Sequence, residues 1–326
     1  MKTRDLSELL LLAAIWGGSF LAMRLAVPAF GPVAMAFLRV AIATVVLLPL
    51  LLARGQWLPL RQRWRQLLVL GLTNSALPFL CFGYAAYTLP TGLAAIFNAA
   101  TPLATALIAW AWLGDPLTRW RSLGLALGFG GVAGLALYKS MLGAGGVGGV
   151  GGAGGVGGSG GVGIVAGMQF DSATALAIAA CLAGTLLYGH AANHAKRYLA
   201  GQPALVLAVG TQLASAAALA VPAALTWPAA MPRLQDWLIV AALGVLASGV
   251  AYMLYFRLML RLGPTQASSV TFLVPVFASL WGALVLGEAV TRPILVGGAV
   301  ILAGTSLVLG LLPRRKAGQP VAIGPT

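Results

Sequence analysis

The sequence predicts an all-α integral membrane protein with about ten transmembrane helices, arranged as two inverted five-helix repeats. Of its 326 residues, 60% are hydrophobic and only 8% are charged, whereas soluble proteins contain about 25% charged residues. The chain also contains about ten apolar windows, each close to the roughly 20 residues that a helix needs to cross a bilayer. Finally, two distant stretches resemble each other and divide the chain into two similar halves.

We expect the spans near residues 9–28, 32–53, 66–88, 91–113, 120–139, 173–194, 203–226, 236–258, 265–287 and 292–312. The first apolar run is too long for a signal peptide and lacks a small-residue cleavage site after it, so we expect it to remain as the first span. Lys and Arg residues concentrate on one side of this topology, which predicts that both termini are cytoplasmic. The same bias explains the net charge of +14 without a nucleic-acid partner.

The two similar stretches are TPLATALIAWAWLGDPLTR, residues 101–119, and VPVFASLWGALVLGEAVTR, residues 274–292. One common offset aligns five pairs: Pro102 with Pro275, Gly114 with Gly287, Asp115 with Glu288, Thr118 with Thr291, and Arg119 with Arg292. Because each half has an odd number of spans, the second copy is inverted in the membrane. Inverted repeats are typical of transporters, with the substrate site near the midplane between the copies.

We therefore expect a first repeat over 1–139, a glycine-rich outer linker over 140–172, a second repeat over 173–313 and a basic cytoplasmic tail over 314–326. The linker contains GAGGVGGVGGAGGVGGSGGVG at 143–163, which includes GxGxxG and GxSxG patterns. Neither pattern follows a strand or opens a helix, as a phosphate loop or a nucleophile elbow requires. Such glycine-rich sequence is typical of a flexible spacer.

Several of these segments resemble the EamA-type branch of the drug/metabolite transporter superfamily. The resemblance rests on LLLLAAIWGGSFLAMRLAV, with Trp16-Gly17-Gly18-Ser19-Phe20, and on GLAAIFNAATPLATALIAWAWLGD with its partner in the second half. It covers both repeats and implies a ten-helix carrier in the cell (inner) membrane, usually an exporter of amino acids or other small metabolites. The long linker departs from the short connection that is usual in the family.

Polar residues within spans usually face the protein interior, because exposing them to lipid is costly. Asn98 and Thr101 share one helix face directly before Pro102, and Trp16 and Tyr188 are expected to correspond between the repeats. The predicted cavity residues are Trp16, Ser19, Asn74, Asn98, Thr101, Tyr188, His190, Tyr252 and Thr271. Helix–helix hydrogen bonding is the alternative for the polar residues, and packing is the alternative for His190 and the aromatic residues.

Two prolines and two arginines within the spans have open roles. Pro102 and Pro275 each free a backbone carbonyl, so they are candidate hinges or cavity-wall carbonyls, or else simple kinks. Arg24 lies near the outer end of the first span and could extend to the headgroups; its inverted counterpart is Lys196. Arg39 is deeper and has no acidic partner within the spans, so it either binds backbone carbonyls or binds a substrate carboxylate.

The residues that are missing narrow the function further. All six acidic residues fall in tails, loops or helix ends. Small multidrug carriers of the same superfamily depend on a glutamate within the first helix, so the resemblance disfavours proton-coupled export of bulky cations and favours a neutral or zwitterionic small-molecule substrate. We expect no cofactor and no metal, because the Cys and His residues form no ligand cluster. An enzyme is disfavoured, whereas an importer, a drug exporter and a receptor or scaffold remain alternatives. Gly124 and Gly128 predict close helix packing within a monomer or in a homodimer.

Overall fold

The computed structural model describes residues 3–142, 171–262 and 270–310, and every regular element in these ranges is a helix. A chain inside a bilayer must satisfy its backbone polar groups without water, and a helix does so within one segment. The predicted all-α class is confirmed for this part of the chain. The predicted linker lies largely outside the described residues, and the basic tail lies entirely outside them.

The first half comprises α1 (Thr3–Ala53), α2 (Trp57–Gln62), α3 (Trp64–Gly71), η1 (Leu72–Ala76), α4 (Leu77–Ala85), α5 (Thr91–Asn98), α6 (Thr101–Ile108), η2 (Ala109–Leu113) and α7 (Arg119–Leu142). The second half comprises α8 (Ser172–Tyr198), α9 (Ala204–Leu225), α10 (Leu234–Ala242), η3 (Leu243–Val250), α11 (Ala251–Leu262), α13 (Val270–Leu286) and α14 (Arg292–Leu309). The elements η1, η2 and η3 are π-helical turns within longer helical runs.

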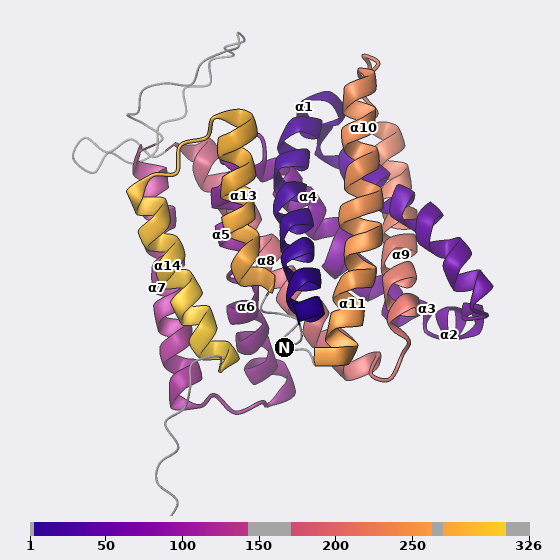
Figure 1. Ribbon diagram of the computed structural model, residues 1–326, viewed down its shortest axis with the longest axis horizontal. Coiled ribbons are helices and arrows are strands. Elements are labelled where there is room, and N and C mark those ends of the chain that lie inside the picture. Colours follow the sequence, from indigo (N-terminus) through magenta and orange to yellow (C-terminus); the bar gives the residue numbers. More distant parts are fainter. Residues whose placement is uncertain (1–2, 143–170, 263–269, 311–326) are drawn as a thin grey trace, which may run out of the picture.

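The longest helix, α1, contains the first two predicted spans. Its 51 residues correspond to about 75 Å, more than twice the roughly 30 Å of a bilayer core. Gly31 has a φ of 71°, a conformation that glycine adopts at little cost, and the helix changes direction there (Figure 1). In the described ranges eight helices are long and apolar enough to cross a membrane. With α1 counted twice and the 17-residue apolar helix α13 added, the described ranges contain ten candidate crossings.

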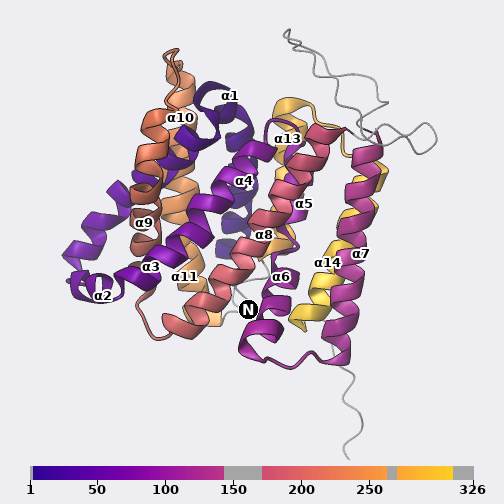
Figure 2. The ribbon, with the colours of Figure 1, turned by 180° about the vertical axis from the view of Figure 1, so that it is seen from behind.

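Two helices from opposite repeats, α7 and α14, lie side by side at one end of the molecule in both views (Figures 1 and 2). A Cβ added to Gly304 of α14 would lie 2.5 Å from the nitrogen of Gly128 and 2.6 Å from the carbonyl oxygen of Gly124. The predicted Gly124/Gly128 packing site is therefore used within one chain, where backbones meet without intervening side chains.

The predicted span 91–113 is not one continuous helix, which corrects the expectation that Pro102 lies inside one. The chain leaves the helical path at Ala99 and Ala100, and Pro102 stands at the start of α6, where a missing N–H costs nothing. Pro275, in contrast, lies inside α13.

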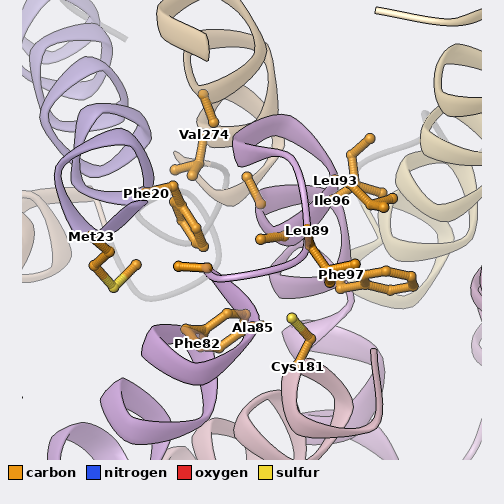
Figure 3. Packing of buried hydrophobic residues seen from close by; sticks show 14 of the residues in the cluster. Phe20, Met23, Phe82, Ala85, Leu89, Leu93, Ile96, Phe97, Cys181 and Val274 are labelled. Carbon is orange, nitrogen blue, oxygen red and sulfur yellow. The ribbon is translucent and has the colours of Figure 1, made fainter. Parts of the chain in front are cut away.

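The apolar core joins both repeats. Figure 3 shows Phe20 of α1 and Phe82 of α4 in the same cluster as Cys181 of α8 and Val274 of α13. Phe20 and Phe82 meet edge to face, with ring centroids 5.7 Å apart. Because residues of both halves of the sequence pack in this core, neither repeat forms it alone.

Candidate functional site

A cluster of aromatic and polar side chains lies where helices of both repeats meet. The ring centroid of Trp16 in α1 lies 6.2 Å from that of Tyr252 and 5.3 Å from that of Tyr255, both in α11. Asn74 in η1 donates from Nδ2 to the Tyr252 hydroxyl at 3.3 Å. Three of the predicted cavity residues, Trp16, Asn74 and Tyr252, are thus in one group. All three are partly buried.

The π-helical turn η3 connects this group to Arg39. Trp16 donates from Nε1 to the carbonyl oxygen of Ala247 at 3.2 Å. The next residue, Ser248, accepts a hydrogen bond of 2.7 Å from Arg39 Nε. A π-helical turn places side chains out of the ordinary helical register, and such turns are frequent at functional sites. Two successive residues of this turn, Ala247 and Ser248, therefore bind the Trp16 indole and the Arg39 guanidinium.

Arg39 is a buried cation whose partners are neutral. Its side chain is 4% exposed; Nη1 lies 3.6 Å from the Met23 sulfur, and Cζ lies 3.8 Å from the centre of the Phe79 ring. It forms no ion pair within the described ranges. It also binds no backbone carbonyl there, so the alternative of carbonyl binding is not what the structure contains.

Two further predicted residues lie next to this cluster. Tyr188 in α8 stacks on Phe82 with ring centroids 6.0 Å apart and packs against the apolar group that includes Phe79. Ser19 is buried and donates to the carbonyl oxygen of Trp16, one turn earlier, at 2.7 Å. Tyr188 thus contributes to the wall of the cluster, whereas the Ser19 hydroxyl is occupied by its own helix.

The residues of the α5–α6 break form a second group. Thr101, at the start of α6, donates from Oγ1 to the carbonyl oxygen of Asn98, at the end of α5, at 2.7 Å. The hydrogen bond therefore connects the two helix ends. Facing them in α8, Thr185 donates to the carbonyl oxygen of Phe97 at 3.3 Å. Asn193 donates to the carbonyl oxygen of Thr105 at 3.0 Å. These bonds hold α8 against the break and leave the Asn98 amide uncommitted among the described residues.

His190 and Thr271 complete the set of predicted residues. The His190 ring stacks on Trp112 with centroids 5.2 Å apart and an angle of 9° between the planes, and its Nδ1 is buried without a hydrogen-bond partner among the described residues. Thr271 is partly buried in the first turn of α13. Within the described ranges no group of three His, Cys, Asp or Glu side chains could hold a metal ion.

Ion pairs join the two repeats at both ends of the bundle, including those of Glu8 in α1 with Arg257 and Arg261 in α11; two of these pairs are related by the inversion. Arg24 in α1 pairs with Glu288, which follows α13, at 3.0 Å between Nε and Oε1. At the end where the chain begins, Lys196 in α8 pairs with Asp115, which follows η2, at 2.8 Å. Asp115 also lines a cavity of about 400 Å³ there. The two acids are the pair that the repeats align, so the ion pairs are inversion-related.

The sequence reasoning missed the partner of Arg24 and the role of Ser248. Arg24 also donates to the carbonyl oxygens of Ala86 at 3.3 Å and Leu89 at 2.6 Å. Its guanidinium therefore binds protein groups, whereas the sequence suggested that it could extend to the lipid headgroups. The sequence did align Asp115 with Glu288 and Arg24 with Lys196 between the repeats, and these two alignments together could have predicted both ion pairs. Ser248 has a counterpart, Ser75, at the same offset as the two prolines.

Known proteins match the chain over most of its length. A sequence profile of the EamA-like transporter family matches residues 7–137 and again 175–310. The uncharacterized inner membrane transporter YedA of Escherichia coli K12 is 27% identical over 311 residues, which cover 94% of this chain and 92% of YedA. The uncharacterized transporter YvbV of Bacillus subtilis is 27% identical over 330 residues, covering 99% of this chain and 96% of YvbV.

A solved crystal structure also shares the fold. It has 21% sequence identity and a TM-score of 0.63, and the match covers 95% of this chain and 98% of that chain. The two family matches fall on the two helical halves, both of which contribute residues to the aligned ion pairs and to the aromatic and polar cluster. The chain therefore belongs to the EamA-like transporter family, and it is a membrane transporter rather than an enzyme.

Proposed function

We propose that the protein is a secondary transporter that exports small zwitterionic metabolites, above all amino acids, by alternating access. The observation that supports this most is the central cluster of Trp16, Asn74 and Tyr252, to which both repeats contribute. In inverted-repeat transporters the substrate site lies near the midplane at the interface between the repeats.

The chemistry of the cluster favours a zwitterion. Asn74 can both donate and accept hydrogen bonds, and the rings of Trp16 and Tyr252 can stabilise an ammonium group through their π faces. Four acids, Asp5, Glu8, Asp115 and Glu288, are engaged in ion pairs. The other two, Asp171 and Asp236, accept hydrogen bonds from backbone nitrogens at the starts of α8 and α10. No carboxylate of the described residues stands in the cluster to select a bulky cation.

Alternating access needs a closure at each end that can open separately. The pairs Arg24–Glu288 and Lys196–Asp115 each join one repeat to the other, so a rocking motion of the repeats must break one pair or the other. With both termini cytoplasmic, as the distribution of Lys and Arg predicts, the first pair closes the outer end of a carrier in the inner membrane. Export then requires the inner pair to open for loading.

Metabolite analysis of the medium tests this proposal. Cells expressing the wild-type protein are compared with cells expressing Trp16→Ala, Asn74→Ala or, as a matched control, Trp120→Ala, whose side chain is exposed on the outside of α7. We expect an amino acid to accumulate outside cells with the wild-type protein and the control, but not with the two cluster variants at equal membrane abundance. Identical media for all four proteins would support a receptor or scaffold, and depletion of a metabolite would support an importer.

A further inference from the structure

Arg39 is a positive charge at membrane depth for which the described protein supplies no negative partner. Its side chain is 4% exposed, yet its contacts are a serine hydroxyl, a methionine sulfur and the face of a phenylalanine ring. Burying a charge without an opposite charge is costly. Ionisable residues within membrane spans usually mark substrate or ion pathways.

The inverted repeat offers an internal comparison for the role of Arg39 in packing. In the second repeat, a Cβ added to Gly244 would lie 3.1 Å from the carbonyl oxygen of Arg39 and 2.7 Å from the Cβ of Ile42. In the first repeat, the aligned Gly71 would lie 2.9 Å from the carbonyl oxygen of Thr211 and 2.8 Å from the Cβ of Ala214. The two helix crossings are the same.

Thr211 therefore occupies the place in one crossing that Arg39 occupies in the other. Because the crossing forms with a neutral threonine, its packing does not require a guanidinium. The hydroxyl groups beside the crossings behave accordingly: Ser248 accepts from Arg39, whereas its counterpart Ser75 is buried without a partner among the described residues. The backbone contact at the crossing thus recurs in the other repeat with a neutral side chain in the place of Arg39.

The hydrogen bonds of Arg39 leave one edge of the guanidinium available. Nε is committed to Ser248, Nη1 faces a thioether, which is a weak acceptor, and Nη2 has no partner within the described ranges. A carboxylate can accept two parallel hydrogen bonds from such a pair of nitrogens. The Phe79 ring covers one face of the guanidinium, so a ligand must approach along the edge of the group and not over that face.

The aromatic cluster lies on the neighbouring turn of the same helix. Tyr252 follows Ser248 by four residues, about one turn along the same helical run, and Tyr252 contacts both Trp16 and Asn74. A ligand whose carboxylate meets Arg39 would present an adjacent ammonium group to these rings, which attract cations.

We propose that Arg39 binds the carboxylate of the transported substrate and restricts transport to molecules that carry one. This assignment rests on the proposed function, since it concerns the same central site. Arg39 would be a specificity-determining residue, and a compound that differs only by replacement of its carboxylate with an amide would be rejected.

Ligand-dependent thermal stability of the full-length purified protein tests the assignment. The probes are the amino acids that occur in proteins and their matched C-terminal amides. We expect at least one acid to raise the melting temperature of the wild-type protein and its amide to have no effect. In Arg39→Gln the apparent affinity for the acid should fall by about 30-fold or more, since truncating one partner of a buried charge pair costs that much.

Two controls separate this loss from unfolding or from a general charge effect. Arg65→Gln removes a charge that stacks on the exposed Trp64 and should retain wild-type binding. Ser248→Ala keeps Arg39 but removes its anchor, and should bind the acid more weakly while still rejecting the amide. The comparison of acid and amide uses the wild-type protein alone, so it stands even if a variant fails to fold.

The results can contradict the two proposals separately. Equal stabilisation by acid and amide, stabilisation by no carboxylate, or unchanged binding in a folded Arg39→Gln would overturn the role of Arg39. If cells export a metabolite without a carboxylate, the proposed export remains and the carboxylate assignment fails. If an acid binds through Arg39 but is not released into the medium, the assignment remains and the proposed export fails.

Discussion

Arg24 and Glu288 are 264 positions apart in the sequence and form an ion pair of 3.0 Å between Nε and Oε1. Glu288 also accepts hydrogen bonds from the backbone nitrogen of Thr91 at 2.8 Å and from its hydroxyl at 3.1 Å. One carboxylate therefore joins α1, the start of α5 and the end of α13. Its side chain is only 13% exposed, so solvent weakens these contacts little.

Replacing Glu288 with glutamine should destabilise the protein measurably. The substitution removes the charge from three contacts and leaves Arg24 partly buried without its partner, at a cost of about 1–3 kcal/mol. Chemical unfolding in mixed micelles measures the change in the free energy of unfolding. Wild-type stability in Glu288→Gln would show that the contacts contribute nothing.

The inverted counterpart should respond more weakly. Lys196 and Asp115 have side chains that are 60% and 38% exposed, and exposed pairs contribute about 0.2–1 kcal/mol. Asp115→Asn should therefore cost less stability than Glu288→Gln in the same assay. A larger loss in Asp115→Asn would contradict this ordering of the two ends.

The same asymmetry predicts which of the two inversion-related ion pairs separates more readily. Leu113 lines the cavity next to Asp115, and Ser279 lines the small pocket next to Glu288; both residues are partly buried. In a background without Cys81 and Cys181, a cysteine at Leu113 should react faster with a water-soluble maleimide than a cysteine at Ser279. Asp115→Asn should accelerate the first reaction, and faster labelling at Ser279 in the parent protein would contradict the prediction.

The adjacent glycines after Trp16 should tolerate alanine very differently. A Cβ at Gly17 would lie 2.6 Å from the Cβ of Phe277 and 2.8 Å from the nitrogen of Ala278. These atoms belong to the backbone region of α13 and cannot move away alone. A Cβ at Gly18 would meet only the Trp281 ring, at 3.7 Å. Gly17→Ala should reduce stability by about 1–3 kcal/mol, whereas Gly18→Ala should not; equal melting temperatures would contradict the described packing of α1 on α13.

The crossing of α7 and α14 allows a similar matched comparison. Gly304→Ala would place a Cβ against the backbone of Gly124 and Gly128, so the helices must separate. Gly130 lies in α7 with Gly124 and Gly128, but a Cβ added there would meet nothing within 4 Å. Gly130→Ala should therefore be neutral or stabilise the helix by about 0.5–1 kcal/mol. Fluorescence-detected size exclusion should show loss of the monodisperse peak for Gly304→Ala only.

The sequence could predict the features that depend on composition and periodicity. The spans follow from apolar length, and the inversion follows from the alignment of Pro102 with Pro275 and of Asp115 with Glu288. The shortage of acidic partners for arginines within the spans also follows from the sequence, because the chain has only six acidic residues. Each of these depends on residue type and spacing along the chain alone.

The features that depend on how helices pack could not be predicted in the same way. The break at Ala99 and Ala100 depends on the support that α8 gives through Thr185 and Asn193. The π-helical turn at Ser248 has no marker in the local sequence, although its inverted counterpart at Ser75 shows that the position recurs. That Asn98 and Thr101 line a cavity together stays a prediction; what the sequence did not indicate is that the Thr101 hydroxyl donates to the backbone carbonyl of Asn98.

The measurement that tests the account most directly is efflux from proteoliposomes that contain the purified protein. Vesicles are loaded with the radiolabelled amino acid that accumulates in the medium, and its release is followed for the wild-type protein, Trp16→Ala and Trp120→Ala. We predict release through the wild-type protein and the Trp120 variant, and release at the rate of empty vesicles through the Trp16 variant. Equal release from all three proteins would place the substrate path elsewhere, and no release above that from empty vesicles would contradict transport of that amino acid by this protein alone.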